Sequence, residues 1–240
     1  MRFVERYVFV GPSISPRSDA SGFPLDLLAG DPTLYVSLGT VFNANPEFFD
    51  ACFDAFTDSD WQVVLSVGTR TDPSTLVRIP DNFLVRTHVP QLEVLEHTGV
   101  FVTHGGMNSV TEAIYYGVPM VVVPQQPEQA MTAARVAELG LGVALEPGQV
   151  TAGALRDAVT TISGDAGYRN RLAHTQQAAR SGRLPARRRC HPAVRPPANP
   201  TGRRGKNPRT KTVIQAALRY LEGEMRKREG GRGLYVTVWR

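Results

Sequence analysis

The stretch THGGMNSVTEAIYYGVPMVVVP, residues 103–124, indicates the class of fold. It contains the end of an apolar strand, a pair of glycines, a helical segment and then a second apolar strand. Gly117 is placed to end the helix, and Pro119 just beyond it keeps the helix from continuing. A strand, a helix and a further strand in this order form the repeating unit of a parallel sheet.

The same alternation extends along the chain on both sides of this stretch. Apolar strands are expected at 33–40, 61–68, 83–89, 100–104, 120–124 and 142–147, and helices at 46–56, 91–97, 107–116, 127–139, 152–162 and 166–180. The strands are apolar along their whole length, which is typical of a sheet covered by helices on both faces. The sequence therefore predicts an α/β fold with a doubly wound parallel sheet, whose ligands bind outside the carboxyl ends of the strands.

One predicted strand end carries the residues of an anion site. After His104, two glycines allow close backbone approach, and the helix that begins near Met107 has N–H groups without helical partners in its first turn. Asn108 and Ser109 lie in that turn and can add donors, as can His104. Glu112 lies one turn deeper, within reach of a ribose diol. Taken singly, each feature is more typical of a tight turn, a packed side chain or a helix cap than of a binding site.

Other polar side chains follow strands at the same edge of the predicted sheet. Glu128 and Gln129 offer a carboxylate and an amide to neighbouring sugar hydroxyls, although an acidic residue is common in a helix's first turn. His88 offers a flat ring for a base, and Ser37 and Thr40 can donate to a phosphate. The segments concerned are PQQPEQ at 124–129, HVPQ at 88–91 and SLGT at 37–40.

The segment HVPQLEVLEHTGVFVTHGGMNSVTEAIYYGVPMVVVPQQPEQ, residues 88–129, resembles the signature of the UDP-dependent glycosyltransferases of glycosyltransferase family 1. Within them it is most similar to the macrolide-type bacterial branch. The resemblance runs from about Tyr7 to Arg180, and the 24 residues from His104 to Glu128 match the family's spacing. It implies the Rossmann-like, carboxyl-terminal, nucleotide-sugar-binding half of a GT-B fold.

By position, the resemblance implies a site for UDP-glucose or a similar UDP-hexose. His88 stands where the family often has a tryptophan stacked on uracil, and Val89 would pair with the base through its backbone. Glu128, where many members have aspartate, would bind the transferred hexose together with Gln129. The residues implied for the ribose are Gln91 and Glu112, and those implied for the pyrophosphate are Ser37, Gly39, Thr40, His104, Gly106, Asn108 and Ser109.

The resemblance also implies a mechanism. In this family an acceptor hydroxyl attacks the anomeric carbon opposite UDP and inverts it, while helix N–H groups and His104 stabilise the charge that develops on UDP. No metal or other cofactor is expected. The general base is expected in an amino-terminal acceptor domain, which a chain beginning MRFVERYVFVGPS is expected to lack. We therefore expect donor binding for transfer to macrolide, polyketide or phenolic acceptors, without activity of this chain alone. A donor subunit paired with a separate acceptor chain is the alternative.

The last part of the chain differs in composition from the rest. Residues 181–240 hold 16 Lys+Arg and 3 Asp+Glu, a net charge of +13, whereas residues 1–180 have a net charge of −8. We therefore predict a donor-binding domain at 1–180 and a basic, Pro- and Arg-rich tail at 181–240. The tail is interpreted as disordered, or as the product of a reading frame that slips near Gly182. Nucleic-acid binding is the non-enzymatic alternative, but residues 181–210 have no aromatic side chain on which bases could stack.

Composition also bears on location. Cys52 and Cys190 lie too far apart to indicate a disulfide framework or a metal site, which favours a reducing cytoplasm. No stretch approaches the roughly 18 apolar residues of a membrane span, and the first residues lack the apolar core of a signal peptide. No Gly-x-Gly-x-x-Gly follows the first strand, which disfavours a dinucleotide-binding enzyme.

Overall fold

The computed structural model describes residues 14, 22–30, 32–40, 45–76 and 79–180. The predictions made for the tail at 181–240, including the frame slip, lie outside the described residues.

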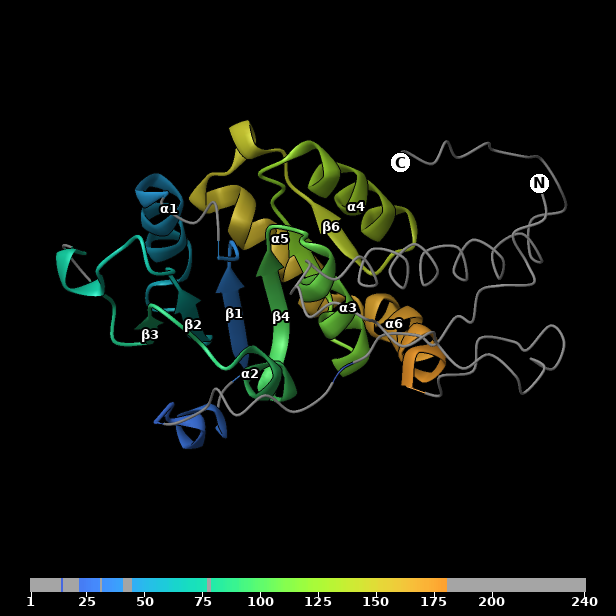
Figure 1. Ribbon diagram of the computed structural model, residues 1–240, viewed down its shortest axis with the longest axis horizontal. Helices are drawn as coiled ribbons and strands as arrows, with labels where there is room; N and C mark the ends of the chain where they lie inside the picture. The colour runs from blue at the N-terminus through green and yellow to red at the C-terminus, as the bar shows by residue number, and fades with distance from the viewer. Residues whose placement is uncertain (1–13, 15–21, 31, 41–44, 77–78, 181–240) are drawn as a thin grey trace, which may run out of the picture. The chain divides into compact units, whose positions relative to one another are not determined.

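Within the described residues, six parallel strands form one sheet in the order β3-β2-β1-β4-β5-β6 (Figure 1). The strands are β1 (Thr33–Ser37), β2 (Gln62–Ser66), β3 (Phe83–Arg86), β4 (Thr98–Thr103), β5 (Met120–Val122) and β6 (Gly142–Ala144). The α/β, doubly wound parallel sheet expected from the sequence is confirmed. Most strands end a few residues before their predicted ends, and after β1 and β2 the glycines Gly39 and Gly68, both with positive φ, turn the chain away from the sheet.

The helices follow the strands as predicted. They are α1 (Pro46–Phe56), α2 (Gln91–His97), α3 (Met107–Tyr116), α4 (Pro127–Glu138), α5 (Ala152–Gly164) and α6 (Ala166–Arg180), with short 3-10 helices η1 (Leu25–Leu28), η2 (Pro73–Thr75) and η3 (Pro147–Gln149). Gly117 ends α3 in the left-handed conformation, with a φ of +75°. In the described part of the chain, no helix is both long and apolar enough to cross a membrane.

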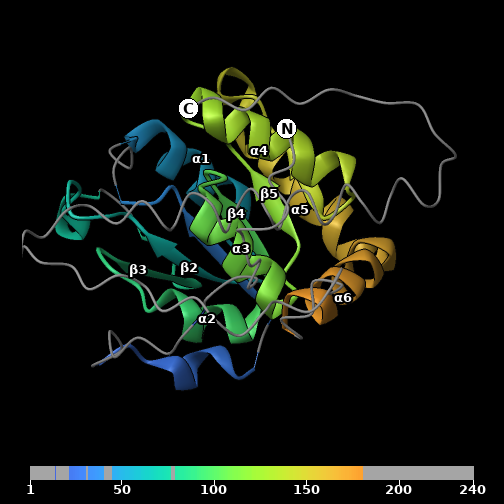
Figure 2. The same ribbon diagram turned by 45° about the vertical axis from the view of Figure 1, so that its right-hand side comes forward.

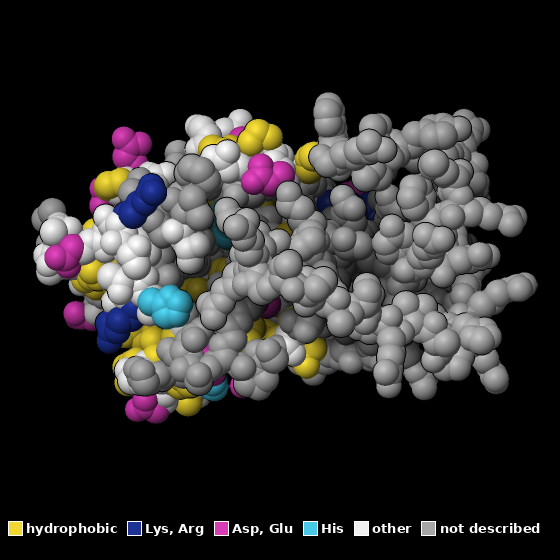
Figure 3. Space-filling model, in the orientation of Figure 1, with side chains coloured by type: hydrophobic (Ala, Val, Ile, Leu, Met, Phe, Trp, Pro, Cys, Tyr) yellow, Lys and Arg dark blue, Asp and Glu magenta, His cyan; other side chains and the backbone are white. Residues whose placement is uncertain are grey.

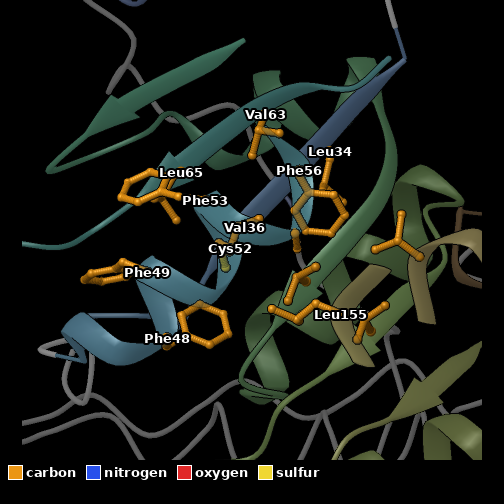
Figure 4. Packing of buried hydrophobic residues seen from close by; sticks show 14 of the residues in the cluster. Leu34, Val36, Phe48, Phe49, Cys52, Phe53, Phe56, Val63, Leu65 and Leu155 are labelled. Atoms are coloured by element: carbon orange, nitrogen blue, oxygen red, sulfur yellow. The ribbon is translucent and has the colours of Figure 1, made fainter. Parts of the chain in front are cut away.

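Helices cover both faces of the sheet, and each face has its own apolar cluster (Figures 1 and 2). Successive side chains of a strand point to opposite faces. Leu34 and Val36 therefore pack towards α1 and α5, whereas Tyr35 packs towards α2 and α3. Figure 4 shows the first cluster, into which α1 places one face of closely packed aromatic side chains. These buried residues of α1 are Phe48, Phe49, Cys52, Phe53 and Phe56.

The strand order reverses between β1 and β4. From β1 the chain runs outward to β2 and β3, and it then returns to the other side of β1 as β4 before continuing to β5 and β6. The ends of β1 and β4 are paired, with Ser37 opposite Thr103. Such a reversal leaves a crevice beyond the carboxyl ends of the two strands, which is where ligands bind in open α/β sheets. The loops at 38–40 and 104–106 therefore border the candidate site.

The helices that begin at this edge differ in how they are capped. The Asn45 side chain accepts a hydrogen bond from the Phe48 N–H at the start of α1, at 3.1 Å. By contrast, the N-caps of α3 and α4, Gly106 and Gln126, make no side-chain cap hydrogen bond. In α4, Pro127 has no N–H and the Gln129 N–H donates to the Gln126 carbonyl at 3.0 Å, so it is mainly the first turn of α3 that leaves N–H groups for other partners.

Candidate functional site

The His104 imidazole lies in a slot between two glycines at the point where the strand order reverses. Gly39 has a φ of +83°, and a Cβ placed there would lie 2.6 Å from Cε1 and 2.8 Å from Nε2 of His104. A Cβ at Gly106 would also collide with the ring. The two glycines, which come from loops more than sixty residues apart in the sequence, therefore hold the imidazole beside the start of α3.

His104 carries a neutral ring at pH 7. Burial lowers its pKa below the ordinary value of 6.5, and the backbone of Ser37 offsets only part of that decrease. Its Nδ1 atom is buried and has no hydrogen bond of good geometry with the described residues. A neutral imidazole has one N–H donor and one acceptor nitrogen, so His104 can donate one hydrogen bond to an anion.

The first turn of α3 lies next to this ring. Gly106 is its N-cap, with extended backbone angles and no acceptor side chain. Asn108 is exposed and Ser109 is half-buried, so both hydroxyl and amide groups accompany the backbone N–H groups of the turn. Uncapped N–H groups and the positive end of the helix dipole together favour an anion. The predicted residues Gly106, Asn108 and Ser109 are thus brought together with His104.

Gly105 brings the start of α4 against the same turn. It has a φ of +79°, and a Cβ there would lie 2.6 Å from Val122 Cγ1 and 3.4 Å from the backbone oxygen of Gln129. Only a glycine allows the loop after β4 to approach β5 and α4 so closely. The uncapped starts of α3 and α4 are consequently neighbours.

The two residues predicted for the hexose have different environments. Gln129 is only 8% exposed, and its Oε1 accepts a hydrogen bond of 2.7 Å from the Gln125 N–H. Glu128 is exposed. Adjacent helical residues point about 100° apart, and the carbonyl of Gln129 is engaged with the loop before the helix. A ligand would therefore meet the carboxylate of Glu128 and the amide nitrogen of Gln129.

A chain of buried polar groups links three elements below the site. The Tyr35 hydroxyl donates to Gln91 Oε1 at 3.2 Å, and Gln91 Nε2 donates to Glu112 Oε2 at 2.6 Å and to Ser109 Oγ at 3.4 Å. Glu112 is only 3% exposed. Gln91 and Glu112, both predicted for the ribose, are therefore in direct contact. Sequence reasoning missed Tyr35, although it is the one hydroxyl-bearing aromatic residue in the buried run TLYVS.

The pKa of Tyr35 is raised well above its ordinary value. Burial is the main cause, the Ser37 hydroxyl opposes it, and the negative charge of Glu112 adds to it. The hydroxyl therefore keeps its proton throughout the physiological range and acts as a hydrogen-bond donor.

The remaining predicted residues border the crevice in different ways. Ser37 is buried, and its Oγ accepts a 3.3 Å hydrogen bond from the Gly39 N–H, which supports the turn. Thr40 and His88 are exposed, whereas Val89 is buried. Figure 3 shows one side of the molecule, on which acidic and basic side chains are interspersed over the described part.

A small pocket that the sequence did not predict opens at the same edge of the sheet. It has a volume of about 90 Å³ and lies between the start of α1, the loop before α4 and η3. Its lining residues are Asn45, Glu47, Phe48, Val123, Gln125, Pro147 and Val150. Among the described residues, no group of three or more His, Cys, Asp or Glu side chains is placed to hold a metal ion.

Residues 30–177 match the protein family described as "UDP-glucoronosyl and UDP-glucosyl transferase". The chain belongs to this family. Among its relatives, the NDP-glycosyltransferase YjiC of Bacillus licheniformis is 48% identical over 176 residues, which are 73% of the chain and 44% of the relative. The demethyllactenocin mycarosyltransferase of Streptomyces fradiae is 44% identical over 150 residues, which are 62% of the chain and 32% of the relative.

Solved structures agree with this family. The crystal structure of CalG4, the calicheamicin glycosyltransferase, superposes with a TM-score of 0.67 at 40% identity, covering 75% of the chain and 46% of that protein. The Rossmann-like fold of a GT-B glycosyltransferase and the macrolide-type bacterial branch, both expected from the sequence, are confirmed. The chain spans less than half of the length of these glycosyltransferase relatives.

Proposed function

We propose that residues 1–180 bind a UDP-hexose as the donor domain of an inverting glycosyltransferase that acts on small hydrophobic acceptors. The observation that carries this proposal is the uncapped start of α3 beside the neutral ring of His104. Backbone N–H groups and one imidazole N–H suit a diphosphate, because they donate hydrogen bonds from fixed positions to its negatively charged oxygens. The description of the family supports UDP as the nucleotide.

The same donors would assist the chemical step. When the bond between the sugar and UDP breaks, negative charge builds up on the leaving diphosphate. Donors that are already oriented towards that position stabilise the transition state without reorganisation. The Gly39 and Gly106 slot, which holds the His104 ring in one orientation, supports such a role. The proposed pyrophosphate contacts are Ser37, Gly39, Thr40, His104, Gly106, Asn108 and Ser109.

The other parts of the donor would occupy the neighbouring groups. Glu112 would accept from the ribose hydroxyls through its carboxylate, which the Gln91 amide contacts by a hydrogen bond. The exposed ring of His88 would stack on the base, with the backbone of Val89 beside it. Glu128 and Gln129 would bind the hexose, with the first accepting hydrogen bonds and the second donating from Nε2.

We propose further that these 240 residues bind the donor in the cytoplasm without completing transfer by themselves. The part of the chain that matches its relatives covers less than half of their length. Of the described histidines, His97 and His174 are exposed, the first in the last turn of α2 and the second on α6. Transfer would then require an acceptor-binding part that supplies the general base.

Titration calorimetry with UDP tests donor binding. We expect UDP to bind the folded chain, and we expect His104→Ala combined with Ser109→Ala to weaken that binding by at least about tenfold, the effect of losing roughly 1.4 kcal/mol. His174→Ala, which changes an exposed histidine on α6, is the matched control. A well-folded chain that does not bind UDP contradicts the proposal.

Incubation with UDP-glucose and a phenolic acceptor tests the second part of the proposal. Mass spectrometry should detect no glucoside after incubation with the 240-residue chain. Turnover above the level of a His104→Ala control would show that the chain completes transfer by itself.

A further inference from the structure

We propose that Tyr35 is a positioning residue for the nucleotide: its hydroxyl fixes the orientation of the Gln91 amide, which in turn holds Glu112 ready for a ribose diol. This inference rests on the proposed binding of a UDP-sugar. Tyr35 lies in β1, Gln91 begins α2 and Glu112 lies in α3. The hydrogen bonds among them therefore join three elements that meet where the strand order reverses.

The ring of Tyr35 is held in place independently of its hydroxyl. It is only 2% exposed and stacks on Phe101 of the neighbouring strand β4, with ring centroids 4.6 Å apart and planes 4° from parallel. A stacked ring between two paired strands has little freedom to rotate. The hydroxyl is consequently presented to Gln91 at a fixed position.

The hydrogen-bond partners of Gln91 permit only one orientation of its amide. Oε1 faces the Tyr35 hydroxyl, and Nε2 faces the Glu112 carboxylate. The reverse orientation would place the amide oxygen against the carboxylate, which accepts but cannot donate when it is ionised. Because burial keeps the proton on Tyr35, this tyrosine donates and the amide oxygen is satisfied.

This arrangement prepares the carboxylate before the nucleotide arrives. Gln91 Nε2 donates to Glu112 at 2.6 Å, whereas its contact with Ser109 Oγ in the first turn of α3 is long, at 3.4 Å, so Gln91 orders the ribose contact more than the diphosphate contacts. Side chains that are already ordered do not lose rotamer entropy on binding, which increases affinity. The gain applies to ligands that carry a ribose and not to pyrophosphate alone.

The test compares UDP with inorganic pyrophosphate by titration calorimetry on the 240-residue chain. Tyr35→Phe keeps the stacked ring and removes only the hydroxyl. We expect UDP to bind about tenfold more weakly, corresponding to about 1.4 kcal/mol, and pyrophosphate to bind as tightly as to the unmodified chain. Tyr168→Phe, which removes a tyrosine hydroxyl from α6, should leave both affinities unchanged. Equal losses for both ligands, or no loss for either, overturn the proposal.

A second variant keeps the proposal testable if Tyr35→Phe does not fold. Gln91→Met retains the length of the side chain and removes both hydrogen-bonding groups of the amide. It should weaken UDP binding and spare pyrophosphate. Gln91→Met binding UDP as tightly as the unmodified chain overturns the role of Tyr35. Failure of the unmodified chain to bind UDP refutes the proposed function itself, whereas normal UDP binding by Tyr35→Phe refutes only this inference.

Discussion

The two faces of the sheet use the same strands for different purposes. The face towards α1 and α5 is filled by aromatic and aliphatic side chains around the buried Cys52 (Figure 4). The face towards α2 and α3 also has an apolar cluster, but it includes the polar chain from Tyr35 through Gln91 to Glu112. Alternating residues of β1 supply both faces. The first face therefore contributes mainly to stability, and the second combines packing with the candidate site.

A core truncation on the apolar face should have the largest effect on stability. Phe56 is almost completely buried beside α5, and Phe56→Ala should reduce the free energy of unfolding by about 3–5 kcal/mol. Urea unfolding measures this loss, with Leu27→Ala at an exposed position as the control. The molecules that remain folded should bind UDP with unchanged affinity. A large change in that affinity would break the distinction between the two faces.

Closing the glycine slot should affect both stability and binding. Gly39→Ala places a Cβ against the His104 ring at a backbone conformation with positive φ, which should cost about 1–3 kcal/mol of stability. UDP affinity should also fall, because the ring is displaced from the start of α3. Unfolding and calorimetry measure the two effects. Gly148→Ala, where a Cβ meets nothing within 4 Å, is the matched control and should change neither.

The stability of the protein should depend on pH through His104. Its pKa in the folded chain lies below the ordinary value of 6.5, so the unfolded chain binds a proton more readily. The contribution of His104 to the free energy of unfolding is fully present above about pH 6.5, the pKa of an unfolded histidine. It is lost as the pH falls towards the lower pKa of the folded state. Urea midpoints between pH 5 and pH 7.5 should show this slope, and His104→Gln should reduce it. An identical slope in His104→Gln and His174→Gln would contradict the assignment.

The smallest effect is expected at the contact between α5 and α1. Arg156 donates from Nε to the Ala55 carbonyl at 3.0 Å and from Nη2 to the Asp54 carbonyl at 2.8 Å, near the end of α1. Arg156→Met keeps most of the apolar stem and removes the donors, and it should cost about 0.5–1.5 kcal/mol. Urea unfolding measures the loss, with Arg169→Met on α6 as the control. A loss as large as that of Phe56→Ala would show that polar contacts, too, support this face.

The sequence by itself determined the order of strands and helices, the parallel sheet and the grouping of His104 with the first turn of α3 at the candidate site. The reason is that these features are local. Continuous apolar runs distinguish buried strands from helices with an apolar face, and the glycines that turn the chain after β4 stand next to the residues they position. His104, Gly106 and Ser109 could therefore be placed together before the structure was known, since they belong to one strand end and one helix start.

Only the tertiary structure decided how residues distant in the chain meet. Tyr35 and Gln91 are 56 positions apart, and Gln91 and Glu112 are 21 positions apart, so their contact depends on the strand order and on the rotation of α2 and α3. The contact of Gly39 with His104 likewise exists because β1 and β4 are neighbours in the sheet. A local pattern of apolar and polar residues contains neither the order of the strands nor the rotation of a helix about its axis. The partners of these polar groups therefore became visible only once the chain was folded.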